Sequence, residues 1–221
     1  MTAAPGSWKA IVFDFDGTLA KLNIDFSGMR AALLELIACY RIPAEGIIHL
    51  HILEMVEAAG TRLALHSPDE APLFSHAAHA LITRIEIEAA SEGTLFAGTR
   101  TLLAELGRRS IRIGVVTRNC RAAVIKTFPD IDRYCQVVLT RDDAYRVKPH
   151  PEHLITALSL LGTHPADAVM VGDHPLDIQL GKETGTYTIG VLSGHSTREA
   201  LFGVGADLIL PDASHILKNI P

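Results

Sequence analysis

The chain has 221 residues, of which 48% are hydrophobic and 20% charged, and its formal net charge is −5 at pH 7. This composition supports a buried core and excludes a disordered or low-complexity chain. Because the charge is negative and no broad basic stripe is present, we expect no sequence-independent binding of nucleic acid.

No apolar run approaches the roughly 20 residues that a membrane span needs. The N-terminal MTAAPGSWKA lacks the charged and apolar regions of a secretory signal. The three cysteines, Cys39, Cys120 and Cys135, show no metal-binding or disulfide spacing, which is typical of reduced thiols. We therefore expect a cytoplasmic protein without a membrane partner, either a monomer or a homodimer.

Short apolar, β-rich segments recur along the chain and predict strands within 9–20, 111–117, 136–140, 167–173, 186–191 and 206–211. Helical patterns lie between them, at 99–109, 151–162 and 175–185. The last two begin with proline and end at glycine, as helices commonly do. This alternation predicts an α/β fold with a Rossmann-like parallel sheet and helices on both faces.

Residues 21–92 interrupt this alternation. They contain no convincing strand, but three helical patterns, at about 25–40, 44–59 and 73–91, with a connecting loop at 60–72. A crossover between parallel strands rarely needs so many residues, so we expect an inserted helical module. The sequence therefore predicts a core domain of 1–20 and 93–221 and a helical cap domain of 21–92.

Polar side chains follow the predicted strands. In chain order they are Asp14, Asp16, Thr117, Lys148, Asp173 and Asp177. Right-handed crossovers bring the carboxyl ends of parallel strands to one edge of a sheet, so we expect these residues to meet there. Neighbouring carboxylates repel each other unless a cation neutralises them, and Mg²⁺ prefers oxygen ligands and commonly holds a substrate phosphate. The pattern therefore predicts Mg²⁺ as the cofactor and a small phosphorylated metabolite as the substrate.

Four motifs resemble those of the haloacid dehalogenase (HAD)-like hydrolase superfamily in order and spacing. They are DFDGTL at 14–19, VVTRN at 115–119, VKPHPE at 147–152 and VGDHPLD at 171–177. The helical insertion resembles the C1 cap of phosphoglycolate phosphatase-like members. The resemblance implies a Mg²⁺-dependent phosphatase that hydrolyses a phosphoglycolate-like phosphomonoester through an aspartyl-phosphate intermediate.

The resemblance also implies a role for each motif residue. Asp14 would be the nucleophile and Asp16 the general acid and base. Asp14, the backbone carbonyl of Asp16 and Asp173 would hold the metal, with Asp177 acting on it indirectly. Thr117 and Lys148 would bind the transferring phosphate and assist catalysis.

Three more residues are expected to bind the substrate. Arg118 follows Thr117 in the second motif, whereas Arg62 and His66 lie in the predicted loop of the helical module. All the predicted chemical groups lie outside 21–92, so we expect that module to select the substrate and to exclude water.

Two other functions remain open. A sugar phosphomutase of the β-phosphoglucomutase type would share Asp14 and Asp16 with the phosphatase. A non-catalytic phosphate receiver or interaction module would also combine acidic strand ends with a threonine and a lysine. Receivers, however, are usually much shorter and lack the late GDxxxD pattern.

Overall fold

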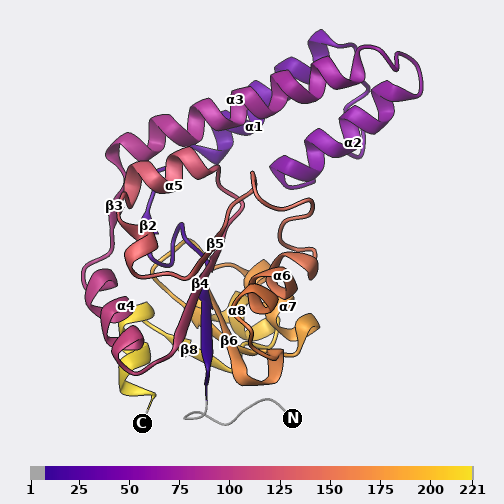
Figure 1. Cartoon of the computed structure of the whole chain (residues 1–221). Coiled ribbons are helices and arrows are strands. Elements are labelled where there is room, and N and C mark those ends of the chain that lie inside the picture. The colour runs from indigo at the N-terminus through magenta and orange to yellow at the C-terminus, as the bar shows by residue number, and fades with distance from the viewer. Residues whose placement is uncertain (1–7, 221) are drawn as a thin grey trace. The chain divides into compact units, whose positions relative to one another are not determined.

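The structure is a computed structural model that describes residues 8–220 (Figure 1). The chain forms two compact units and passes between them twice, after Leu22 and before Ala90. One unit runs up to Leu22 and resumes at Ala90, and we call it the core unit. The other, Asn23–Ala89, is called the helical unit.

The core unit is built on a six-stranded sheet. Its strands are β1 (Ala10–Phe13), β4 (Arg112–Val116), β5 (Val137–Leu139), β6 (Ala168–Gly172), β7 (Tyr187–Val191) and β8 (Leu208–Leu210). They lie in the order β5-β4-β1-β6-β7-β8, and every neighbouring pair is parallel. The predicted Rossmann-like parallel sheet is thus confirmed, and the strand order reverses at β1, where such sheets open a crevice for ligands.

Helices cover both faces of this sheet. They are α4 (Thr99–Arg108), α5 (Arg121–Thr127), α6 (Glu152–Leu160), α7 (Pro175–Thr184) and α8 (Arg198–Gly203). Helices α6 and α7 contact each other on one face, whereas α4 packs with the 3₁₀ segment Ala213–Lys218 on the other (Figure 1). Val12 and Met170 of the sheet share a fully buried cluster with Leu154 of α6. Burial on both faces explains why the strands are continuous apolar runs rather than alternating ones.

The helical unit consists of α1 (Phe26–Cys39), α2 (Ile52–Ala64) and α3 (Ala71–Glu92), whose last residues belong to the core unit. It has its own apolar core, which includes Met29, Leu33, Met55 and Phe74. This second core explains why the segment folds as a unit, since an inserted module must bury its own helix faces.

Two boundaries predicted in this unit are wrong. The predicted helix at 44–59 begins only at Ile52, because Gly46 has a φ of +75°, which a right-handed helix does not allow. The predicted loop at 60–72 is shorter, because α2 continues to Ala64 and buries Leu63 in the core of the unit.

Several short elements were not predicted. The antiparallel pair β2 (Ala20–Lys21) and β3 (Thr94–Leu95) has two residues in each strand, too few to produce a periodic pattern. Helices α5 and α8 are also short. Among residues 8–220, no helix combines the length and apolarity required to cross a bilayer.

Candidate active site

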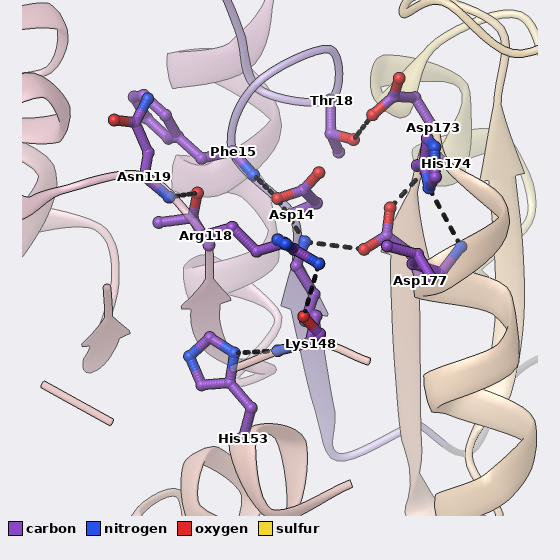
Figure 2. Close-up of polar contacts among 12 residues, drawn as sticks. Asp14, Phe15, Thr18, Arg118, Asn119, Lys148, His153, Asp173, His174 and Asp177 are labelled. Carbon is purple, nitrogen blue, oxygen red and sulfur yellow. Dashed lines mark hydrogen bonds and ion pairs between the residues drawn. The ribbon is translucent and has the colours of Figure 1, made fainter. Parts of the chain in front are cut away.

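Three strands of the sheet end in polar, buried residues at the same edge. Asp14 follows β1, Thr117 follows β4 and Asp173 follows β6. Phe13 of β1 is in register with Val115 of β4 and with Val171 of β6, so the three strands reach this edge together. The predicted convergence of the motif residues is therefore present in the core unit (Figure 2).

Asp14, Asp173 and Asp177 form an acidic cluster, in which one carboxylate oxygen of each residue lies within 4.8 Å of the others. All three side chains are buried. Like charges at this separation in a low-dielectric environment repel strongly, so the cluster requires a nearby positive charge.

Lys148 supplies one positive charge. Its Nζ lies 2.6 Å from Oδ1 of Asp14 and 2.7 Å from Oδ1 of Asp177. Burial disfavours the ammonium, but the two carboxylates more than compensate and raise the pKa of Lys148 above its ordinary value. Lys148 is thus a buried cation that bridges the end of β1 and the start of α7 (Figure 2).

Asp177 has a second task at the start of α7. Its Oδ2 accepts a hydrogen bond from the backbone N–H of His174 at 3.1 Å, while Nδ1 of His174 accepts from the N–H of Leu176. This reciprocal arrangement is a capping box, which satisfies N–H groups that a helix leaves unpaired at its start. One carboxylate therefore fixes the helix and binds Lys148 at the same time.

Asp173 is enclosed by backbone. Its Oδ2 accepts from the N–H of His195 at 3.2 Å. A Cβ added at Gly17 would lie 2.6 Å from the Asp173 carboxylate, and one added at Gly194 would lie 1.8 Å from it. A side chain at either position would therefore displace the Asp173 carboxylate, and Gly17 also has a φ of +80°.

Sequence reasoning missed the segment 193–195. Ser193 Oγ donates to the carbonyl oxygen of Gly17 at 2.7 Å, so this segment holds the loop that follows Asp16. Its position directly after a predicted strand could have indicated this role, because the segment follows β7, whose carboxyl end lies at the same edge of the sheet.

The acids of this edge are buried unequally. Burial raises the pKa of Asp14 despite the opposing charge of Lys148, and burial together with repulsion from Asp14 and Asp177 raises that of Asp173. Asp16 is half-buried, and desolvation raises its pKa to about 7, although its Oδ1 accepts from the N–H of Leu22 at 2.9 Å. In each case burial is the largest cause, and repulsion from a neighbouring carboxylate adds to it.

The donor set fits a hard divalent cation. Oδ1 of Asp14 accepts from Lys148 and from the N–H of Phe15, whereas Oδ2 takes part in neither contact. Together with Asp173, this leaves carboxylate oxygens at a separation that one ion can bridge. All the donors are oxygens, as Mg²⁺ prefers.

Thr117 and Arg118 both belong to the core unit, and Arg118 lies beside Lys148 (Figure 2). The N–H of Thr117 donates to the carbonyl oxygen of Leu139 at 3.0 Å, and Thr117 Oγ1 accepts from the N–H of Asn119. Arg118 Nη1 donates to the carbonyl oxygen of Lys148 at 2.9 Å. The two residues predicted from the second motif therefore contact the third motif or the strand that leads to it.

The other two predicted substrate-binding residues belong to the helical unit. Arg62 does not lie in a loop as predicted but within α2, where Nη1 donates to the carbonyl oxygens of Pro43 and Glu45. His66 is exposed, in the turn that follows α2.

Comparison with known proteins identifies a family model and a relative that each match most of the chain. The family model for haloacid dehalogenase-like hydrolases matches residues 11–191. The pyrophosphatase PpaX of Bacillus pumilus is 30% identical over 217 residues, which cover 96% of each chain.

Solved structures share the fold. A mutant of CbbY from Rhodobacter sphaeroides in complex with xylulose-1,5-bisphosphate has a TM-score of 0.64 and 26% identity, covering 93% of this chain and 94% of that one. A predicted phosphoglycolate phosphatase from Haemophilus somnus has a TM-score of 0.65 and 19% identity, covering 96% of this chain and 97% of that one.

Proposed function

The chain belongs to the haloacid dehalogenase-like hydrolase family, and from that premise we propose that it is a Mg²⁺-dependent phosphatase of a small phosphorylated metabolite. The substrate class is a phosphoglycolate-like phosphomonoester. The observation that supports this most is the buried cluster of Asp14, Asp173 and Asp177, in which Asp14 and Asp177 contact the Lys148 ammonium. Such a site suits a dianionic phosphate only when a further cation is bound.

Asp14 is the nucleophile in this proposal. One carboxylate oxygen of Asp14 attacks phosphorus while the other would face the metal, and the bond from phosphorus to the alcohol oxygen breaks. Asp16, whose pKa of about 7 lets it hold a proton near neutral pH, gives that proton to the leaving oxygen. Asp16 then takes a proton from the water that hydrolyses the aspartyl phosphate.

Lys148 and Thr117 bind the transferring phosphoryl group. Phosphoryl transfer depends mainly on positioning and on charge stabilisation, which a buried ammonium and a fixed hydroxyl provide. Arg118, held beside Lys148, would bind another part of the substrate.

Asp14, Asp173 and the backbone carbonyl of Asp16 would hold Mg²⁺, with Asp177 acting through Lys148 or a water molecule. The ion would neutralise phosphate charge and orient the phosphorus for in-line attack. This assignment rests on the oxygen donors and their separation.

We also propose that a cap domain at 21–92 selects the substrate, while 1–20 and 93–221 perform the chemistry. The helical unit supplies no carboxylate to the acidic cluster, which supports this division. A protein with this chemistry would act in the cytoplasm, where phosphorylated metabolites are abundant.

Pyrophosphate hydrolysis is a second candidate activity. It is favoured by the 30% identity to the pyrophosphatase PpaX over nearly the whole chain. Pyrophosphate presents the same transferring group with a phosphate as the leaving group, so the same residues would serve.

A substrate panel tests the proposal. Phosphoglycolate, sugar monophosphates and bisphosphates, pyrophosphate and a small aryl phosphate are supplied to the purified chain with Mg²⁺, and kcat/KM is measured for each. We expect hydrolysis that chelation abolishes and a preference for one monoester, whereas a preference for pyrophosphate would select the second candidate. No turnover of any compound would contradict both.

A pair of variants tests the metal site. Asp173→Asn should raise the Mg²⁺ concentration that half-maximal activity needs, because a charged ligand becomes neutral. Asp167→Asn is the matched control, since Asp167 precedes β6 and pairs with exposed Lys9 at the other end of the strand. Equal Mg²⁺ requirements in the two variants would contradict the assignment of Asp173.

A further inference from the structure

His153 is a buried histidine, 1% exposed, near the start of α6. Its Nδ1 accepts a hydrogen bond from the backbone N–H of Lys148 at 3.2 Å. Its Nε2 lies 3.2 Å from the carbonyl oxygen of Leu139, to which it donates. Because Nδ1 accepts, the proton of the neutral ring is on Nε2, and both ring nitrogens are satisfied.

The same carbonyl oxygen also holds Thr117. The N–H of Thr117 donates to the oxygen of Leu139 at 3.0 Å. The imidazole of His153 therefore connects the backbone of Lys148, through one shared carbonyl group, to the backbone of Thr117. These are the two residues that the proposed function assigns to the transferring phosphate.

The ring is suited to this contact because it stays neutral. Burial, together with the positive charge of Lys148, lowers the pKa of His153 to about 3. A protonated imidazole would present an N–H to the Lys148 amide and lose the bond. At neutral pH the acceptor on Nδ1 is therefore preserved.

Each polar group of Lys148 has a partner. Its N–H donates to His153, its carbonyl oxygen accepts from Arg118, and its ammonium contacts Asp14 and Asp177. A lysine side chain loses considerable rotamer freedom when it is fixed, so a rigid backbone is needed to aim the ammonium reproducibly.

We propose that His153 is a positioning residue that holds the backbone of Lys148 and thereby sets where the Lys148 ammonium lies in the phosphoryl site. The inference rests on the proposed phosphatase function. It differs from a purely structural role, in which the ring would only satisfy two buried backbone groups and stabilise the core unit.

Two conservative variants separate these roles, because each retains one of the two hydrogen bonds. In His153→Asn, the amide oxygen replaces Nδ1 and still accepts from Lys148, but the side chain does not reach Leu139. In His153→Gln, the amide nitrogen replaces Nε2 and still donates to Leu139, but Lys148 loses its acceptor. The Tm of both variants should fall to a similar extent.

We expect kcat to separate the variants where stability does not. His153→Gln should lower kcat by about 10–100-fold with little change in KM, as small misplacements of catalytic groups do. His153→Asn should remain within a few-fold of the wild type. Hydrogen exchange of the Lys148 amide, measured without Mg²⁺ or substrate, should accelerate in His153→Gln and stay slow in His153→Asn.

The proposal would be overturned if His153→Gln kept the wild-type kcat, or if His153→Asn lost as much kcat as His153→Gln. It would also be overturned if the Lys148 amide exchanged equally fast in both variants. A failure of the proposed function is a different result, since the wild type itself would then hydrolyse none of the phosphate panel. The exchange measurement still tests the position of Lys148 in that case.

Discussion

At the scale of single residues, two aspartates in one loop have different surroundings. Asp14 is buried against the Lys148 ammonium, which favours its charged form. Asp16 is half-buried and forms no ion pair with residues 8–220, and its pKa is raised to about 7 by desolvation. Burial raises the pKa of Asp14 as well, to about 6, so the separation lies in their partners more than in their pKa values: the proposed mechanism gives attack to Asp14, beside the ammonium, and proton transfer to Asp16.

This separation predicts the behaviour of Asp16→Asn. The variant should lose about 10²–10⁴-fold in the phosphorylation step with an alkyl phosphate, because general acid catalysis contributes that much. An aryl phosphate with an acidic leaving group should lose much less, since its leaving oxygen needs no proton. Rapid-quench kinetics with both substrates would show this, and equal losses would refute the acid role.

The lowered pKa of His153 predicts how the free energy of unfolding depends on pH. Its pKa is lowered to about 3 in the folded protein, whereas an unfolded histidine titrates near 6.5. The unfolded chain therefore binds the proton more readily, and the stabilising contribution present above about pH 6.5 is lost as the pH falls toward 3.

Urea unfolding of the wild type and of His153→Asn at pH 7.5 and pH 5 measures this effect. Between about pH 6.5 and pH 5 the wild type should lose about 2 kcal/mol more of its unfolding free energy than the variant does. The comparison cancels the other titrating groups. Parallel pH profiles for the two proteins would show that His153 does not take up a proton on unfolding.

At the scale of elements, the loop at 193–195 is as much a part of the site as the four motifs. Its backbone approaches the Asp173 carboxylate so closely that a Cβ at Gly194 would lie 1.8 Å from it. Gly194→Ala should therefore displace the carboxylate and raise the Mg²⁺ concentration needed for activity.

Gly107→Ala is the control for this variant. Gly107 lies within α4, and a Cβ there would meet no atom within 4 Å. That variant should keep its Mg²⁺ dependence and gain about 0.5–1 kcal/mol of stability, because alanine favours a helix over glycine. If both variants kept the wild-type Mg²⁺ dependence, the loop would have no part in holding Asp173.

At the scale of the whole molecule, the sequence predicted the parallel sheet and the meeting of the motif residues, because both follow from short apolar runs that alternate with helical patterns and from the chirality of crossovers. It did not predict the contact of 193–195 with Asp173, since GVLSGH contains no Asp, Glu, Lys or Arg that would indicate a place in the site. It also placed Arg62 in a loop, because Gly60 resembles a helix end, whereas the burial of Leu63 extends α2. His153 was missed because a histidine inside a helical pattern gives no sign of its backbone partners.

The proposed division of labour predicts that the helical unit affects substrate choice. His66 is exposed, so His66→Ala should change kcat/KM for a natural phosphate more than for a small aryl phosphate, with unfolding unchanged. Arg62→Ala should in addition destabilise the helical unit by about 1 kcal/mol, because it removes hydrogen bonds to Pro43 and Glu45. Equal losses on both substrates in His66→Ala would place that residue in the catalytic machinery.

The central claim is that Asp14 forms a covalent bond to phosphorus, and trapping that bond tests it most directly. The wild-type chain is mixed with Mg²⁺ and its best substrate, quenched in acid within milliseconds, digested and examined by mass spectrometry. The account predicts a phosphoryl group on Asp14 that forms and decays at rates compatible with turnover. It also predicts that Asp14→Asn, although folded, shows neither this adduct nor more than a trace of activity. Full turnover without any phosphorylated Asp14, or undiminished turnover in Asp14→Asn, would contradict the account.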